Sequence, residues 1–145
     1  MEGEPLLILL VEDNPAHARL VLRGLKDHKI ANRITHVSDG QEALDYLFHH
    51  GQYSDKAKNP LPHVVLLDLR LPKVDGLEVL KEIKTSPELQ RIPVVILTTS
   101  EAEKDIAQAY DYHANAYLAK PVDFNEFMNQ MNDLGFFWLC WNVHS

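Results

Sequence analysis

The chain has 145 residues, 46% of them hydrophobic, so it is long enough for one domain with a buried core and too hydrophobic for a disordered segment. Its formal net charge of −7 argues against a general nucleic-acid binder, because binding to phosphate backbones depends on Lys and Arg. The single cysteine, Cys140, cannot form a disulfide within the chain, and no stretch has the pattern of a membrane span or an export signal. We therefore expect a cytoplasmic, single-domain protein that binds neither nucleic acid nor membranes.

The first part of the chain alternates strand and helix patterns. Residues 6–11 form an apolar run, and Asn14-Pro15 then supplies an N-cap and a proline at the first helical position. A short second strand is expected over 33–37, and Asp39 is expected to cap the helix after it. The apolar residues at helical spacing are Ala18, Val21, Leu22 and Leu25 in the first helix, and Ala43, Leu44, Leu47 and Phe48 in the second.

The second part continues the alternation after residues 49–63, a polar, proline-containing stretch that we expect to be a long surface loop. Strands are expected over 64–67, 94–97 and 116–119. A fourth, less regular helix is expected over 101–112. Residues at helical spacing are Gly76, Val79, Leu80 and Ile83 in the helix after the third strand, and Ile106 and Tyr110 in the helix over 101–112. In the last helix they are Phe124, Phe127, Met128 and Met131.

Three of the five strand patterns, at 6–11, 64–67 and 94–97, are continuously apolar rather than alternating. Such runs are typical of strands that are covered on both faces. Repeated strand–helix units with right-handed crossovers place a parallel sheet between two helix layers. We therefore expect a doubly wound α/β fold with a five-stranded parallel sheet.

Charged and hydroxyl side chains stand where these strands end. Glu12-Asp13 follow the first strand, Asp68 the third, Thr98 the fourth and Lys120 the fifth. Ligands of such sheets bind at the carboxyl ends of the strands, so three carboxylates and a lysine converge if the first and third strands are neighbours. A hard divalent cation such as Mg²⁺ would relieve the repulsion among these acids. Carboxylates, a hydroxyl and an ammonium together suit phosphoryl transfer.

Four segments in this order, LLILLVEDN, VVLLDLRLPKVDG, IPVVILTTS and AYLAKP, resemble the receiver domain of two-component response regulators over nearly the whole chain. The resemblance implies one receiver domain over 1–145, with a core at 5–134, an aromatic extension at 135–145 and the flavodoxin-like strand order 2-1-3-4-5. The stretch GQYSDKAKNPLPHVVLLDLRLPKVDG and the terminal FFWL are similar to the small stand-alone regulators of cyanobacterial and bacterial phytochrome-type histidine kinases. Relatives of that subgroup also serve kinases that are not photoreceptors, so light sensing is not implied.

The resemblance implies that Asp68 accepts a phosphoryl group from a sensor histidine kinase in a reaction that needs Mg²⁺, for which Mn²⁺ can substitute. Glu12, Asp13, Asp68 and the backbone carbonyl of Arg70 would hold the metal, with Glu12 acting mostly through water. Arg70 stands where the subgroup usually has asparagine. Its side chain could shield or crowd the acyl phosphate, which bears on the dephosphorylation rate and on the choice of donor.

The resemblance also implies a switch. Lys120 would neutralise the phosphoryl oxygens, Thr98 would donate its hydroxyl to them, and Tyr117 would turn inward as Thr98 moves. The bond before Pro121 is cis in the family. From the sequence pattern alone, Thr98 can be an ordinary hydroxyl at a strand end. Tyr117 can be an ordinary half-buried aromatic residue.

The expected protein is a signalling domain rather than an enzyme, although it can assist its own phosphorylation and dephosphorylation. Little chain follows the last helix, so we expect output through protein contacts, to a downstream protein or to a phosphotransfer protein as a phosphorelay intermediate. A phosphatase of the haloacid-dehalogenase type would need a second acid where Arg70 stands. A flavodoxin-like cofactor binder would need a phosphate loop where Glu12-Asp13-Asn14 stand. A receiver that acts as a fixed scaffold, without phosphorylation, is the remaining alternative.

The run FFWLCW near the C-terminus is unusually aromatic. Phe136, Phe137, Trp138 and Trp141 can pack on the core or form an interface, and we favour an interface for a homodimer or a partner. The eight histidines show no metal-ligand spacing, and we expect them to be solvated.

Overall fold

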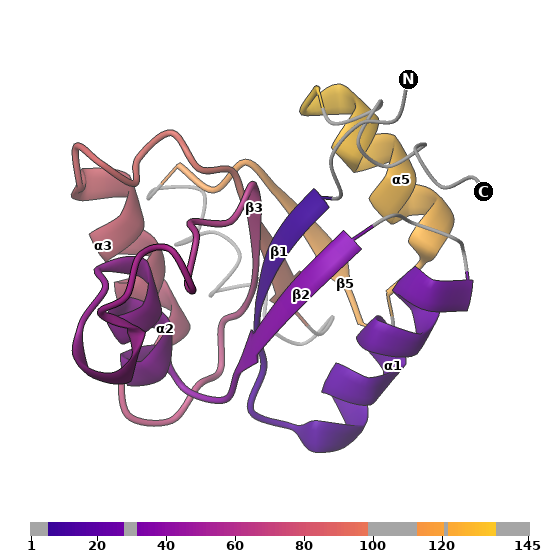
Figure 1. Cartoon of the computed structure of the whole chain (residues 1–145). Coiled ribbons are helices and arrows are strands. Elements are labelled where there is room, and N and C mark those ends of the chain that lie inside the picture. The colour runs from indigo at the N-terminus through magenta and orange to yellow at the C-terminus, as the bar shows by residue number, and fades with distance from the viewer. Residues whose placement is uncertain (1–5, 28–31, 99–112, 121, 136–145) are drawn as a thin grey trace.

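The computed structural model describes residues 6–27, 32–98, 113–120 and 122–135. Its sheet has five parallel strands in the order β2-β1-β3-β4-β5, as expected (Figure 1). Each strand agrees with the sequence-based prediction to within one residue at either end. The strands are β1 Leu6–Val11, β2 Asn32–Val37, β3 Val64–Asp68, β4 Val94–Thr98 and β5 Ala116–Ala119.

The helices of the described ranges are α1 Pro15–Asp27, α2 Gly40–Leu47, α3 Gly76–Thr85 and α5 Phe124–Asp133. The helix expected at 101–112 lies outside the described residues. Both predicted caps are confirmed: Asn14 Oδ1 accepts from the backbone N–H groups of Ala16 and His17, and Asp39 Oδ1 accepts from that of Glu42. No helix in these ranges combines the length and apolar character that crossing a bilayer requires.

The two faces of the sheet carry separate cores. Because side chains alternate along a strand, Ile8 and Leu10 of β1 pack toward α1 and α5, whereas Leu9 and Val11 pack toward α2 and α3. Figure 1 shows α1 and α5 on one side of the sheet and α2 and α3 on the other. The continuous apolar runs of β1, β3 and β4 therefore reflect strands that are buried from both sides.

Residues 49–63 form the predicted long loop, with one short 3₁₀ helix at Gly51–Tyr53 that the sequence did not indicate. Polar contacts fasten the loop to the domain. The Tyr46 hydroxyl donates to Pro60 O at 2.7 Å, and His49 Nε2 donates to Asn59 O at 2.7 Å. His63 Nδ1 accepts from the backbone N–H of Leu7 at 2.9 Å. The expectation of solvated histidines is therefore wrong for His49 and His63, which hold backbone groups.

The loop after β3 rests on the start of α2. The Gly40 N–H donates to Pro72 O at 3.3 Å, and Lys73 Nζ lies 3.4 Å from Asp39 Oδ2. A Cβ on Gly40 would lie 2.6 Å from the backbone carbonyl carbon of Val74, so only glycine allows this approach. The contact fixes the path of the chain just beyond Asp68.

We predict that Asp39→Ala lowers the free energy of unfolding by about 1 kcal/mol, because the first turn of α2 loses its cap. The exposed ion pair with Lys73 adds little. Urea unfolding followed by circular dichroism measures the change. Asp45→Ala, on the same helix, is the control and should cost no more than about 0.5 kcal/mol, since it removes only a surface hydrogen bond from Gln41. Equal losses in the two variants would contradict the capping role.

Candidate functional site

The strand register brings the predicted site residues to one edge of the sheet. Val11 is paired with Leu67, so Glu12 and Asp68 follow side by side. On the other side of β3, Asp68 is paired with Leu97, and Thr98 is paired with Ala119. Lys120 therefore follows β5 at the same level as the two acids, and the predicted convergence at the carboxyl edge is confirmed.

Three carboxylates gather at this edge. Glu12 and Asp68 are buried, with 1% and 6% of their surface exposed, whereas Asp13 is exposed. Each of the three offers an oxygen within 4.8 Å of the others. Glu12 and Asp68 are shielded from solvent and close together, so their carboxylates repel each other strongly unless a cation lies between them.

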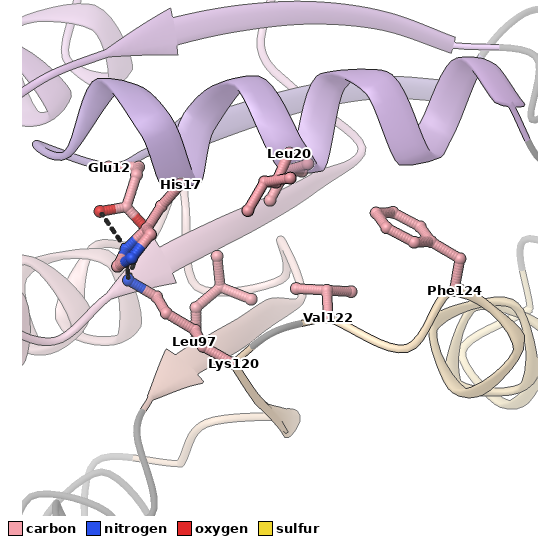
Figure 2. Close-up of a pocket in the computed structure, with 8 residues that line it drawn as sticks. Glu12, His17, Leu20, Leu97, Lys120, Val122 and Phe124 are labelled. Carbon is pink, nitrogen blue, oxygen red and sulfur yellow. Dashed lines mark hydrogen bonds and ion pairs between the residues drawn. The ribbon is translucent and has the colours of Figure 1, made fainter.

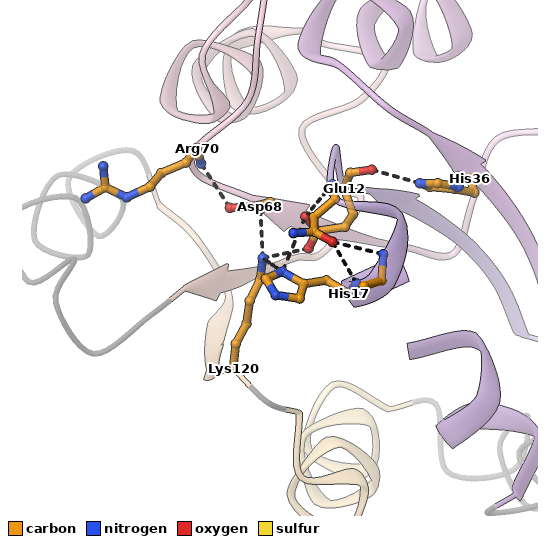
Figure 3. A network of polar contacts seen from close by, with 8 residues as sticks. Glu12, His17, His36, Asp68, Arg70 and Lys120 are labelled. Atoms are coloured by element: carbon orange, nitrogen blue, oxygen red, sulfur yellow. Dashed lines mark hydrogen bonds and ion pairs between the residues drawn. The ribbon is translucent and has the colours of Figure 1, made fainter. Parts of the chain in front are cut away.

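Lys120 supplies that cation in the structure. Its Nζ lies 2.8 Å from Asp68 Oδ2 and 2.6 Å from Glu12 Oε1, and 13% of its side chain is exposed. Figure 3 shows the ammonium reaching both acids from the end of β5, and Figure 2 shows it beside Glu12. The contact with Asp68 is a directed hydrogen bond, while that with Glu12 is a close ion pair that leaves Oε1 without a hydrogen bond of good geometry.

The charges at this edge shift each other's protonation. Burial raises the pKa of the Glu12 carboxyl from its ordinary 4.5 to about 7, and the neighbouring Asp68 acts in the same direction. The contact with Lys120 opposes this rise without cancelling it. Burial alone would lower the pKa of Lys120, but its contacts with Asp68 and Glu12 outweigh burial and raise it. Lys120 therefore stays charged, and Glu12 takes up a proton more readily than an ordinary glutamate does.

The backbone of the loop after β3 holds the second oxygen of Asp68. The Arg70 N–H donates to Asp68 Oδ1 at 3.0 Å, so the carboxylate is fixed between Arg70 and Lys120. The guanidinium of Arg70 is exposed and points away from Asp68 in Figure 3. In this structure the side chain does not crowd the free carboxylate, and its effect on an acyl phosphate stays a prediction.

Gly76 brings α3 against the strand end that carries Asp68. Its N–H donates to Leu69 O at 3.1 Å, and a Cβ at this position would lie 2.6 Å from Leu69 Cα. The sequence suggested only a turn and a helix start at Asp75-Gly76. The structure adds a second role, because any side chain here would push α3 away from the backbone of Asp68 and Leu69.

Two histidines at this edge were missed by sequence reasoning. His36, near the end of β2, donates from Nε2 to the backbone oxygen of Glu12 at 2.8 Å (Figure 3). His17, in the first turn of α1, places Nδ1 at 3.3 Å from Lys120 Nζ and 4.0 Å from Glu12 Oε2. The positions of both residues, beside strand ends that carry acids, were the signal that could have identified them.

A cavity of about 370 Å³ opens beside the charged cluster (Figure 2). Glu12, His17 and Lys120 form its polar end. The remainder is apolar and lies between α1 and the start of α5, lined by Leu20, Val21, Leu97, Val122 and Phe124.

The other predicted site residues are only partly described. Thr98 ends β4 and Tyr117 lies within β5, at backbone positions that agree with the prediction, and their side chains lie outside what the structure describes. Pro121 lies outside the described residues. So do the predicted interface residues Phe136, Phe137, Trp138 and Trp141.

The donors at this edge fit a hard divalent cation. Three carboxylates converge within 4.8 Å, and Glu12 Oε1 is a buried oxygen without a hydrogen bond among the described residues. Oxygen ligands of this kind are those that Mg²⁺ and Mn²⁺ prefer. The sequence-based expectation of a divalent metal site is therefore supported by the donor set.

The family model of the response regulator receiver domain matches residues 8–132, and the chain belongs to this family of two-component signalling proteins. None of the alternatives weighed from the sequence is supported by the comparisons. The chain is a receiver domain that acts in signal transduction.

Among curated relatives, the probable methanogenesis regulatory protein FilR2 of Methanothrix harundinacea is 48% identical over 96% of this chain and 87% of its own length. Response regulator Rcp1 of Synechocystis is 44% identical over 93% of this chain and 90% of its own length. The name of FilR2 concerns methanogenesis, so relatives at this level of identity are not confined to light signalling.

Solved structures of response regulators are similar to this chain in fold and sequence. The bacteriophytochrome response regulator AtBRR superposes with a TM-score of 0.81 at 49% identity, covering 94% of this chain and 96% of its own. The Mn²⁺-bound form of Rcp1 gives 0.75 at 44% identity (93% and 95%), and the phosphorylated cyanobacterial phytochrome regulator RcpA gives 0.76 at 42% identity (93% and 94%). The predicted similarity to phytochrome-associated regulators is thereby confirmed.

We predict that the metal-free protein loses stability as the pH rises, because the raised pKa of Glu12 makes its ionised form costly in the folded state. This contribution is fully favourable below about pH 4.5 and is lost as the pH passes through about 7, by about 3 kcal/mol in total. Glu12→Gln should flatten the dependence and be more stable than the wild type above about pH 7.

Urea unfolding in chelator between about pH 5 and about pH 8 tests this prediction. The exposed Glu88→Gln is the control and should follow the wild-type curve. A Glu12→Gln curve that is parallel to the wild-type curve would show that Glu12 does not carry the pH dependence.

Proposed function

We propose that Asp68 is the residue that takes the phosphoryl group, and that the donor is the phosphohistidine of a sensor histidine kinase. The observation that carries this proposal is the placement of one buried carboxylate between two fixed donors, with Arg70 N–H on Oδ1 and Lys120 Nζ on Oδ2. Family membership and the phosphorylated form of RcpA support it.

The chain's own residues prepare the reaction by orientation and charge. A carboxylate oxygen of Asp68 attacks the phosphorus, and the bond between phosphorus and the donor's imidazole nitrogen breaks as the new oxygen–phosphorus bond forms. The electron pair leaves with the imidazole, which takes up a proton from water. Lys120, 2.8 Å from Asp68, is placed to balance the negative charge of the transferred group.

Glu12, Asp13 and Asp68 would hold Mg²⁺ together with the backbone carbonyl of Arg70, and Mn²⁺ would serve in its place, as the Mn²⁺-bound form of Rcp1 suggests. When bound, the ion would offset the repulsion between the carboxylates and the incoming phosphoryl oxygens. Glu12 Oε1, which has no hydrogen bond among the described residues, and the exposed carboxylate of Asp13 are the groups that this role would use.

Phosphorylation of Asp68 would be passed on through a change in a protein-binding surface. Thr98 and Lys120 would contact the phosphoryl group, and Tyr117 would turn inward with Thr98. This movement would change the surface around β5 and α5, which a downstream protein or a phosphotransfer protein would read. The chain would act as a signalling domain that assists its own phosphorylation and dephosphorylation rather than as an enzyme for another substrate.

We also propose where the protein is located, where its core ends and which residues form an interface. A cytoplasmic setting suits a chain with the single cysteine Cys140. The core would span 5–134, in keeping with the family match at 8–132. The extension at 135–145 would place Phe136, Phe137, Trp138 and Trp141 in an interface for a homodimer or a partner.

We predict that Asp68→Asn abolishes phosphorylation by acetyl phosphate, because the amide is a far weaker nucleophile than the carboxylate. Intact-protein mass spectrometry measures the added phosphoryl group. Asp75→Asn is the matched control, since its side chain is exposed and makes no capping hydrogen bond to α3, and it should be labelled like the wild type. Labelling of Asp68→Asn at the wild-type level would move the acceptor to another residue.

We also predict that removal of Mg²⁺ with a chelator stops labelling while the protein stays folded, because Lys120 keeps the acids paired without metal. Circular dichroism confirms the fold, and added Mg²⁺ or Mn²⁺ should restore labelling. Labelling that continues in chelator would contradict the metal's role, and loss of the fold would show that the metal is structural.

A further inference from the structure

The ammonium of Lys120 has a third neighbour beyond the two acids. A lysine ammonium carries three N–H donors. Asp68 Oδ2 accepts one of them at 2.8 Å, and Glu12 Oε1 lies 2.6 Å from the nitrogen as an ion-pair partner. His17 Nδ1, at 3.3 Å, is the third neighbour, and Figure 3 shows its ring against the lysine.

We propose that His17 is a positioning residue for phosphoryl transfer, which holds the Lys120 ammonium against Asp68 and Glu12 by accepting its third N–H at Nδ1. The inference rests on the proposed function, because it concerns the lysine that would meet the phosphoryl oxygens. His17 touches neither the acceptor carboxylate nor the donor in this role. It acts through Lys120.

The start of α1 fixes the place of the histidine. His17 lies in the first turn, where Asn14 Oδ1 accepts from its backbone N–H at 3.1 Å. Its side chain is 44% exposed, so burial does not hold the ring. The cap sets the backbone, and the contact with Lys120 sets the ring. To accept at Nδ1, the imidazole is neutral and carries its proton on Nε2.

The cavity beside the cluster leaves room for other Lys120 rotamers, which the contact with His17 would restrict. His17 and Lys120 line the same cavity of about 370 Å³, whose far part is apolar around Leu20 and Phe124 (Figure 2). A long lysine side chain beside open space has many rotamers to explore. An acceptor at the polar end of the cavity reduces this freedom and keeps the ammonium on the side of the acids.

Three variants of His17 test the inference. His17→Leu keeps the bulk but has no acceptor. We expect labelling by acetyl phosphate to be about three- to tenfold slower than in the wild type, which corresponds to one ordinary hydrogen bond because this contact is long and partly exposed. His17→Asn places Oδ1 near the position of Nδ1 and should recover most of the rate. His50→Leu, at an exposed histidine outside the site, is the control and should label at the wild-type rate.

A double-mutant cycle shows whether His17 acts through the lysine. In a Lys120→Gln background, His17→Leu should change the labelling rate by less than about twofold. The Lys120 ammonium resonance gives a second readout that needs no phosphorylation. By NMR it should be protected from exchange with water in the wild type and in His17→Asn, and should be exposed in His17→Leu.

The outcomes separate this inference from the proposed function. Wild-type labelling together with an unaffected His17→Leu rate and an unaffected ammonium resonance overturns the positioning role and leaves Asp68 as the acceptor. A slow His17→Leu that Asn fails to rescue, or that stays equally slow without Lys120, also overturns it. Labelling that survives Asp68→Asn overturns the proposed function instead.

Discussion

Two carboxylates and one ammonium share a small, nearly dry space at the carboxyl edge of the sheet, and the site depends on this balance. Glu12 and Asp68 repel each other, and Lys120 offsets one of their two charges. Burial and the remaining repulsion from Asp68 raise the pKa of Glu12, whose Oε1 has an ion pair but no hydrogen bond. The cluster is therefore left one cation short. This imbalance makes it receptive to a divalent metal, and the metal in turn makes it receptive to a phosphoryl group.

The fold keeps this unfavourable arrangement in place. Parallel pairing aligns the ends of β1, β3 and β5. The charged residues can separate only if strands of this sheet move, and the sheet is packed against a hydrophobic core on each face. Close backbone contacts add to this. Gly76 brings α3 against Asp68, and Gly40 supports the loop beyond it. The core thus supplies the energy that holds like charges together, which is a common relation between a rigid scaffold and a functional site.

Much of this site could be predicted from the sequence, because strand ends in a parallel sheet share one edge. That rule places Glu12, Asp68 and Lys120 together once apolar runs identify the strands. The same rule cannot place His17 or His36, whose contacts depend on the orientation of a helix turn and on a tautomer. Nor can it give the direction of a long side chain. The side chain of Arg70 points away from Asp68 in Figure 3, whereas its backbone N–H donates to Asp68 Oδ1.

The central claim is that Asp68, the carboxylate held between Arg70 and Lys120, carries the phosphoryl group. Borohydride reduces an aspartyl phosphate to homoserine, which leaves a permanent mark at the site. The most direct measurement is therefore peptide mapping by tandem mass spectrometry of the protein after treatment with acetyl phosphate, Mg²⁺ and borohydride. The account predicts homoserine at position 68 and unmodified aspartate at position 13. Homoserine at position 13 or at another acid, with position 68 unchanged, would contradict it.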